Sequence, residues 1–246
     1  MRRKDMMENF LTIETSDGPM SAFVCCEEGE QKRPVVIILQ EAFGVNHHIK
    51  DICERFAREG FLAIAPELYH RSGKHIQVEY GDKNTFMPLM GALSNEKMAQ
   101  DLKATEKFLE NLSNADKNNV FCIGFCMGGF GAVLASMELK LKGAISFYGA
   151  GQVRSREGMG LKPLVSQYNE INCPVQYFFG EDDSSIPSTD RSAIESALKE
   201  NHKTYHFHVF NNSDHGFFCN ERSVFNPQSA KLAWAETLSF IQKLKT

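Results

Sequence analysis

The segment FCIGFCMGGFGAV, residues 121–133, has the residue spacing that indicates chemistry most directly. Its central thiol, Cys126, lies two residues after Gly124 and two residues before Gly128. In the pattern glycine-x-nucleophile-x-glycine, a strand turns sharply into a helix and raises the nucleophile above the carboxyl edge of a sheet. A Cβ at either glycine would collide with the neighbouring backbone. The first N–H groups of the helix favour a thiolate. The sequence therefore predicts a reactive thiol, and a buried structural cysteine is the alternative.

Such a nucleophile needs a base and an acidic group that orients the base, in the chain order nucleophile, acid, histidine. Asp183 lies three residues after Gly180, directly beyond an apolar segment, and this spacing favours it over the neighbouring Asp182. His215 follows in the segment FNNSDHGFF, after the last predicted strand. Singly, such residues are more often loop residues, helix caps or structural histidines. Their order along the chain predicts a triad of Cys126, Asp183 and His215.

The segments between these residues predict the scaffold that positions them. Short, nearly continuous apolar segments are typical of strands covered on both faces, and segments with helical spacing lie between them. The strand ranges are 34–40, 60–67, 119–124, 143–149 and 174–180, and the helix ranges are 49–58, 95–112, 130–138 and 188–199. This alternation favours an α/β fold with a mostly parallel, twisted sheet and helices on both faces.

The two ends of the chain complete a sheet of about eight strands. Residues 10–15 and 20–26 flank SDGP and predict an antiparallel hairpin. Residues 204–210 alternate like a strand, and residues 229–245 have the spacing of a closing amphipathic helix. The ranges 70–93 and 149–172 have no clear periodicity. They are either ordinary surface loops or excursions that shape a substrate pocket.

Length and composition narrow the class of protein. The 246 residues predict one domain over residues 1–246, with residues 1–8 as a candidate disordered segment. A net charge of -4 favours a small-molecule substrate over nucleic acid or a membrane surface. The seven cysteines form no CxxC pair and indicate reduced thiols, and the N-terminus lacks the apolar core of a signal peptide. We expect a cytoplasmic protein, a monomer or small homo-oligomer, without a cofactor.

The chain resembles the dienelactone hydrolase (carboxymethylenebutenolidase) family of the α/β-hydrolase superfamily, from about Met20 to the C-terminus. The motifs that carry the resemblance are QEAFGVN (40–46), PELYHR (66–71), GFCMGG (124–129), FYGAG (147–151), GEDDSSIP (180–187) and DHGFF (214–218). A cysteine in the elbow together with a glutamate after the third strand is fairly specific to this family. The resemblance implies an α/β-hydrolase fold with Cys126 as nucleophile, His215 as base and Asp183 as the partner of His215.

The resemblance also implies roles for residues around the thiol. Glu41 matches the family glutamate that holds the resting thiol until substrate displaces it, and a carboxylate beside a thiolate would repel it. The alternative for Glu41 is a loop residue that caps the following helix. The backbone N–H groups of Ala42 and Met127 would form the oxyanion hole.

The substrate is less well defined by the resemblance. Arg71 aligns with a family arginine that binds the substrate carboxylate, and a guanidinium suits two-point recognition of that group. Where the family has a second arginine, this chain has Cys219, and the nearby Arg222 is a candidate replacement. An ester, a lactone and a thioester are all compatible with this pattern.

The sequence thus predicts a cysteine-dependent hydrolase that transfers an acyl group to water through a thioester intermediate. One alternative is a thiol redox or sensor protein that uses Cys122 and Cys126, although Cys122 lies inside a predicted strand. Another is a binding module without catalysis, with a metal held by His202, His206 and His208. Residues 206 and 208 share a strand face, but no third ligand of clear spacing follows, so we predict no metal site. A dinucleotide fold is disfavoured because the G-x-G-x-x-G spacing is missing.

Overall fold

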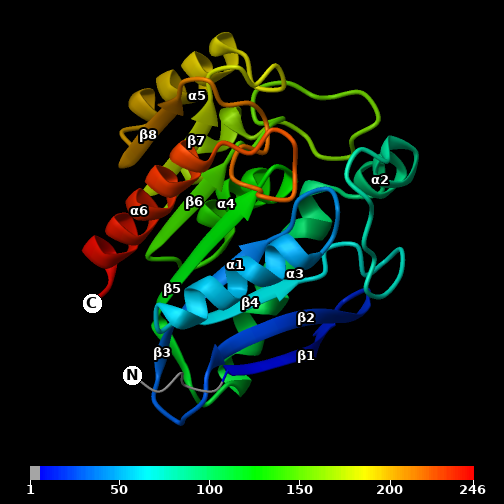
Figure 1. Ribbon diagram of the computed structural model, residues 1–246, viewed down its shortest axis with the longest axis vertical. Coiled ribbons are helices and arrows are strands. Elements are labelled where there is room, and N and C mark those ends of the chain that lie inside the picture. Colours follow the sequence, from blue (N-terminus) through cyan, green and yellow to red (C-terminus); the bar gives the residue numbers. More distant parts are fainter. Residues whose placement is uncertain (1–5) are drawn as a thin grey trace.

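The computed structural model describes residues 6–246 and contains one sheet of eight strands in the order β1-β2-β4-β3-β5-β6-β7-β8 (Figure 1). The strands are β1 (Met6–Thr15), β2 (Gly18–Glu27), β3 (Arg33–Leu39), β4 (Leu62–Pro66), β5 (Ala115–Phe125), β6 (Gly143–Phe147), β7 (Val175–Gly180) and β8 (Tyr205–Phe210). The first two strands form an antiparallel hairpin, β2 pairs antiparallel with β4, and all other neighbours are parallel. The predicted fold class and the N-terminal hairpin are therefore confirmed.

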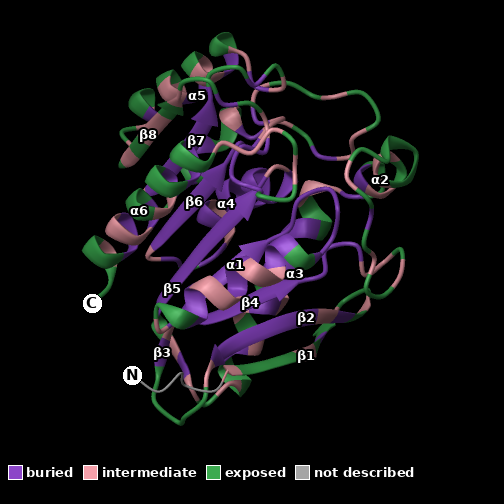
Figure 2. Cartoon of the chain, in the orientation of Figure 1, coloured by how far each residue is buried: buried purple, intermediate pink, exposed green. Residues whose placement is uncertain are grey.

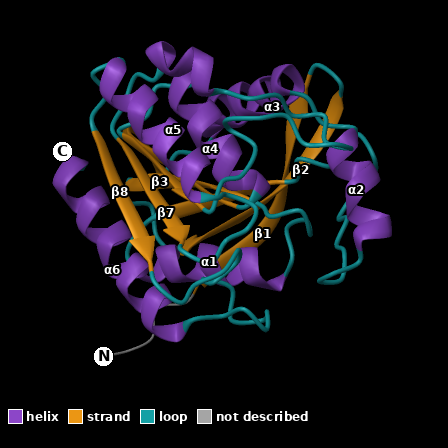
Figure 3. Cartoon of the chain, turned by 90° about the horizontal axis from the view of Figure 1, so that it is seen from above, coloured by secondary structure: helices purple, strands orange, loops and turns teal. Residues whose placement is uncertain are grey.

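The helices cover both faces of this sheet. They are α1 (His47–Arg58), α2 (Lys83–Gly91), α3 (Asn95–Phe108), α4 (Met127–Glu138), α5 (Ser188–Glu200) and α6 (Pro227–Leu244), with short 3₁₀ helices at Leu109–Asn111 and Val165–Glu170. Figure 3 shows α1 and α6 on one face of the sheet and α3, α4 and α5 on the other. Each parallel connection can bury the apolar stripe of its helix against the sheet.

The central strands β3, β4, β6 and β7 are buried almost from end to end (Figure 2). This explains their sequence pattern, because a strand with helices on both faces has no solvent-facing side chains that would produce an alternation. The outer strand β8 is a strand as its sequence predicts, but its residues are half-buried except for the exposed His206 and Val209, so burial does not alternate strictly along it. A core of this kind fixes the carboxyl ends of β5, β7 and β8 relative to one another.

The range 70–93 differs from its prediction, since it contains α2. Asp82 caps the helix by accepting a hydrogen bond from the Thr85 N–H, and only Met90 of the helix is buried. A helix with one buried residue and an internal proline, Pro88, has no apolar stripe that periodicity could detect.

At the N-terminus, residues 6–8 of the candidate disordered segment lie in β1, and residues 1–5 lie outside the described part of the chain. Among residues 6–246, no helix combines the length and the apolar character needed to span a bilayer.

Candidate active site

Cys126 occupies a strained turn between β5 and α4. Its φ of 54° and ψ of -114° are rare for a residue with a side chain, and its N–H donates to the Phe147 carbonyl at 3.0 Å. A Cβ on Gly124 would lie 1.8 Å from the Gly128 carbonyl oxygen, and a Cβ on Gly128 would lie 2.3 Å from the Leu39 carbonyl oxygen. The two glycines are thus required by close backbone contacts, which is the steric reason that the sequence suggests for their spacing.

The carboxyl ends of β7 and β8 bring Asp183 and His215 together. His215 Nδ1 lies 2.8 Å from Asp183 Oδ2, and the other oxygen, Oδ1, accepts a hydrogen bond from the Ser185 N–H at 2.8 Å. Because the buried carboxylate can only accept, Nδ1 carries the proton and Nε2 is left for the cavity side. Asp182 is exposed, so Asp183 is the acid that the fold pairs with His215.

The electrostatic environment keeps His215 charged. Burial lowers its pKa, but the Cys126 thiolate and the Asp183 carboxylate raise it more strongly, to about 10. The ring of Tyr148 packs edge-on against the imidazole at 5.2 Å between ring centres. His215 can therefore carry a positive charge close to the Cys126 sulfur.

Ala42 and Met127 lie beside the thiol, and both line the same cavity as Cys126. Met127 is the first residue of α4, where N–H groups have no partner within the helix. The Tyr69 hydroxyl donates to the Ala42 carbonyl oxygen at 3.1 Å and contacts Met127 Sδ at 3.6 Å. Tyr69 thus ties the two predicted oxyanion-hole residues together. It lies within the PELYHR motif, but its hydroxyl contacts could not be predicted from spacing.

The triad opens into a cavity of about 670 Å³. Most of its lining is apolar and comes from the loop after β3, from α2 and α4, and from the segment after β6: Phe43, Phe86, Met87, Met90, Phe130, Met159 and Leu161. Charged side chains at its surface are Lys83, Arg156, Glu157, Asp214 and Arg222. The two ranges without clear periodicity, 70–93 and 149–172, both contribute to this wall. A cavity of this size and character suits a small molecule with an apolar body.

The two candidate substrate arginines have different surroundings. Two ion-pair hydrogen bonds join Arg71 to the buried Asp101, at 2.7 and 2.9 Å, and a third joins its Nε to Asp17 at 2.5 Å. Arg222 lines the cavity, and Arg71 is not among the described residues that line it. Arg222 has one long contact, 3.5 Å from its Nη1 to Glu41 Oε1. The structure therefore brings Arg222, and not Arg71, to the triad.

Glu41 is buried behind the triad with an exposed fraction of 1%. Burial raises the pKa of its carboxyl group, while the positive charges of Arg222 and His215 act in the opposite direction. The Gln40 side chain fixes the loop, since its amide donates to the Glu41 carbonyl oxygen and its oxygen accepts from the Leu68 N–H. The partner of Glu41 Oε1 in this structure is Arg222, and the role of Glu41 in holding the thiol stays a prediction.

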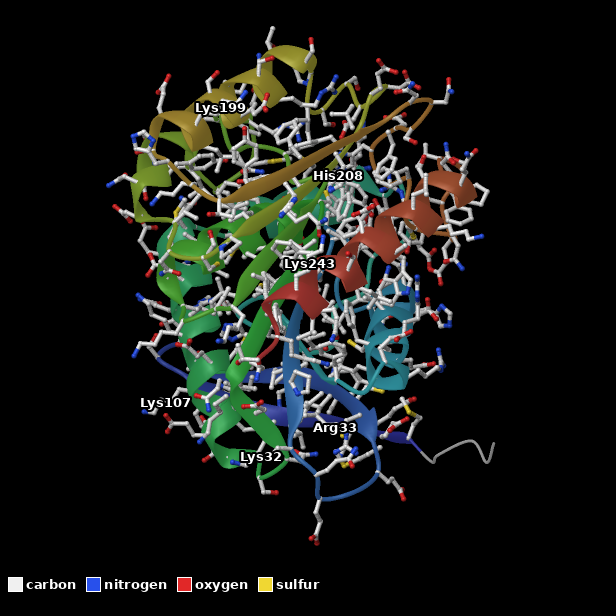
Figure 4. The ribbon with its side chains drawn as sticks, turned by 90° about the vertical axis from the view of Figure 1, so that its left-hand side faces the viewer. Lys32, Arg33, Lys107, Lys199, His208 and Lys243 are labelled. Carbon is white, nitrogen blue, oxygen red and sulfur yellow. The ribbon has the colours of Figure 1, made fainter. Side chains whose placement is uncertain are left out.

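The cysteines and histidines that the redox and metal-binding alternatives require are less well positioned for those functions. All seven cysteines are free, and Cys122 is buried within β5. His208 lies on β8 (Figure 4) and is bonded to Gln176 at 3.1 Å, while His206 packs against Phe240 of α6. Within residues 6–246, the histidines 202, 206 and 208 do not form a group with metal-binding spacing, whereas Glu41, His48 and Cys219 do.

Comparisons with known proteins agree with the fold. The family model described as "Dienelactone hydrolase family" matches residues 20–245. A protein from Synechocystis sp. named "Putative carboxymethylenebutenolidase" is 33% identical over 243 residues, which cover 97% of either chain. A protein of the same name from Salmonella typhimurium is 32% identical over 209 residues, which cover 84% of this chain and 76% of that protein.

Among solved structures, a protein from Klebsiella pneumoniae described as "Putative Dienelactone Hydrolase" superposes with a TM-score of 0.90 at 30% identity, over 97% of this chain and 99% of the other. The two chains therefore share the overall α/β fold.

Proposed function

Because the chain belongs to the dienelactone hydrolase family and is a carboxylic ester hydrolase, we propose that it hydrolyses a small ester, lactone or thioester by acyl transfer to Cys126. The observation that carries the proposal is the hydrogen bond between His215 and the buried Asp183, next to a cysteine held in a strained elbow. A structural cysteine would need neither the strain nor the charged partner.

In the first step, the thiolate of Cys126 attacks the acyl carbon and forms a C–S bond. The N–H groups of Ala42 and Met127 stabilise the oxygen that becomes negative, and Tyr69 keeps the Ala42 peptide in place. As the bond from the acyl carbon to the leaving atom breaks, the His215 imidazolium donates its proton to that atom, which is oxygen in an ester or lactone and sulfur in a thioester. An ester thereby loses an alcohol, and an opened lactone keeps its new hydroxyl group as part of the acyl chain.

In the second step, the neutral imidazole of His215 takes a proton from water, whose oxygen attacks the thioester carbon. The C–S bond breaks, the carboxylic acid leaves, and the thiolate and imidazolium form again. Asp183 stabilises the imidazolium and fixes the tautomer in which Nε2 faces the reacting atoms, because its Oδ2 holds the Nδ1 proton.

The cavity supports a substrate with an apolar acyl part and an anionic group. The apolar wall accepts the hydrocarbon portion, and Arg222 is the guanidinium on the triad side that can meet a carboxylate. Arg71 is already neutralised by Asp101 and Asp17. We therefore assign to Arg222 the substrate role that the resemblance implies for Arg71.

The test compares hydrolysis of 4-nitrophenyl acetate and of dienelactone by the wild-type protein and by Cys126→Ala. We expect the variant to lose at least about 10³-fold in kcat for both substrates, as is typical when a covalent nucleophile is removed. Cys173→Ala is the matched control, because Cys173 is a buried free cysteine that does not line the cavity. Undiminished turnover by a folded Cys126→Ala protein would refute the mechanism.

A further inference from the structure

Three buried side chains behind the triad form a group that the hydrolysis does not use as a unit. Glu41 follows β3, His48 lies in the first turn of α1, and Cys219 follows the His215 turn. One ligand atom from each lies within 4.8 Å of the other two, and the exposed fraction of each residue is 1% or less. Glu41 and His48, which are seven residues apart, thus meet Cys219, which is distant from both in the sequence.

The polar atoms of this group lack partners to an unusual degree. Both ring nitrogens of His48 are buried without a hydrogen-bond partner, and Glu41 Oε2 has none besides the nearby Tyr148 hydroxyl, which lowers the pKa of the Glu41 carboxyl group. The imidazole is packed among the rings of Phe125 and Phe218, at 5.6 and 6.4 Å between ring centres, which offer no acceptor. Buried polar atoms are almost always paired with protein or ordered water, so the two unpaired ring nitrogens of His48 beside Glu41 and Cys219 point to a further partner at this place.

We propose that Glu41, His48 and Cys219 form a binding site for a divalent transition metal of the zinc type. A thiolate, an imidazole and a carboxylate are the donors that such ions take, whereas Mg²⁺ and Ca²⁺ prefer oxygen donors alone. Zinc–ligand bonds of about 2.0–2.3 Å place tetrahedral donors about 3.5 Å apart. The three ligand atoms lie within 4.8 Å of one another, so a closure of at most about 1.3 Å would bring them to this spacing.

Charge also favours a divalent ion at this site. A thiolate at Cys219 and a carboxylate at Glu41 neutralise its two positive charges, and the neutral imidazole of His48 adds none. Arg222 contacts the other oxygen of Glu41, Oε1, at 3.5 Å, so this ion pair leaves Oε2 for the metal. Three protein ligands leave a fourth position for water.

A polar route connects the site with the surface. The Tyr80 hydroxyl lies 3.3 Å from Cys219 Sγ and donates to Glu221 Oε2 at 3.1 Å. Glu221 in turn pairs with His47, whose side chain is 85% exposed. A cation can therefore be attracted by the Glu221 carboxylate at the surface and pass Tyr80 before it reaches the thiol.

The test uses Co²⁺ as the probe, because a thiolate bound to cobalt gives a charge-transfer absorption band. Wild-type protein should bind one equivalent of Co²⁺ with this band, and Zn²⁺ should displace it. Cys219→Ser should lose the band, and His48→Gln should weaken binding at least about tenfold. Cys126→Ser and Cys173→Ser should keep both the band and the affinity, because neither thiol belongs to the site.

Two results would overturn the proposal: absence of the band in wild type, or a band that disappears in Cys126→Ser and persists in Cys219→Ser, since the metal would then bind the catalytic thiol. Circular dichroism establishes whether each variant folds. If Cys219→Ser does not fold, the melting temperature decides: Zn²⁺ should raise it for wild type and Cys126→Ser, and an equal rise for His48→Gln would refute the site.

Discussion

The catalytic edge of the sheet and the outer wall of the cavity are constructed in different ways. At the edge, Cys126, Asp183 and His215 follow the ends of three strands and are fixed by backbone contacts and buried hydrogen bonds. The outer wall comes from α2 and from residues 150–161, whose side chains are mostly half-exposed. Figure 1 shows α2 standing apart from the sheet.

This difference separates the chemistry from the choice of substrate. The packed core holds Cys126, Asp183 and His215 in a single geometry at the edge of the sheet. A substitution at one of these residues should therefore alter kcat for every substrate. The wall is apolar and carries its charges on flexible side chains, so a change there should alter KM and substrate preference. The following experiments test this division, beginning with the largest expected effect.

Asp183→Asn should lower kcat by about 10³-fold for any substrate, because an amide can donate to His215 and stabilise the wrong tautomer. Steady-state kinetics with 4-nitrophenyl acetate provides the measurement. Asp182→Asn is the matched control and should retain activity, since Asp182 is exposed and adjacent in sequence. Equal activity in the two variants would mean that the His215–Asp183 bond does not contribute to catalysis.

Gly128→Ala should cost at least about 3 kcal/mol of the free energy of unfolding, because the new Cβ would lie 2.3 Å from the Leu39 carbonyl oxygen and 2.6 Å from that of Gln40. The control on the wall side is Gly81→Ala. There φ is +89° but no atom lies within 4 Å of the new Cβ, so the cost should be only about 1–2 kcal/mol. Urea unfolding measures both, and equal costs would contradict the view that the edge is the more tightly packed region.

These two regions also differ in how far the sequence predicts them. The elbow glycines, Asp183 and His215 occupy positions dictated by steric contact and strand ends, which leave a local pattern. Helix α2 produces no such pattern in the sequence, because only one of its residues, Met90, is buried. The partners of Arg71 are equally hidden, since Asp17 and Asp101 lie 54 and 30 residues away in the chain.

The same limit applies to the group behind the triad. The sequence singles out Glu41 through the resemblance and Cys219 through a missing arginine, but no spacing pattern connects Cys219 with Glu41 or with His48, which is seven residues after Glu41. Their proximity depends on the packing of α1 against the sheet and on the path of the chain after His215. Long-range convergence of this kind has no periodicity and becomes visible only in three dimensions.

The charge state of His215 offers a third test of the edge. Burial alone would lower its pKa, and the Cys126 thiolate is the largest influence that raises it to about 10. Wild-type His215 should therefore stay protonated through neutral pH and lose its proton only as the pH approaches about 10. Cys126→Ala should move this titration to lower pH by at least about one unit, equivalent to about 1.4 kcal/mol.

The measurement is an NMR titration of the His215 ring, assigned by its loss in His215→Gln. Cys173→Ala serves as the control and should leave the titration unchanged, because Cys173 lies away from the cavity. A wild-type titration near neutral pH that does not respond to Cys126→Ala would mean that the thiol and the imidazole do not form an ion pair at the edge.

The two arginines provide the smallest effect and the most direct test of the wall. Arg222→Met should raise KM for dienelactone, which carries a carboxylate, by about tenfold and leave KM for the neutral 4-nitrophenyl acetate nearly unchanged. Arg71→Met should leave both KM values unchanged and instead lower stability, because it removes the ion pair of the buried Asp101. If Arg71→Met raised KM for dienelactone and Arg222→Met did not, Arg71 would have to leave Asp101 and Asp17 to reach the substrate. The wall would then rearrange on binding, and specificity could not be inferred from which charges line the empty cavity.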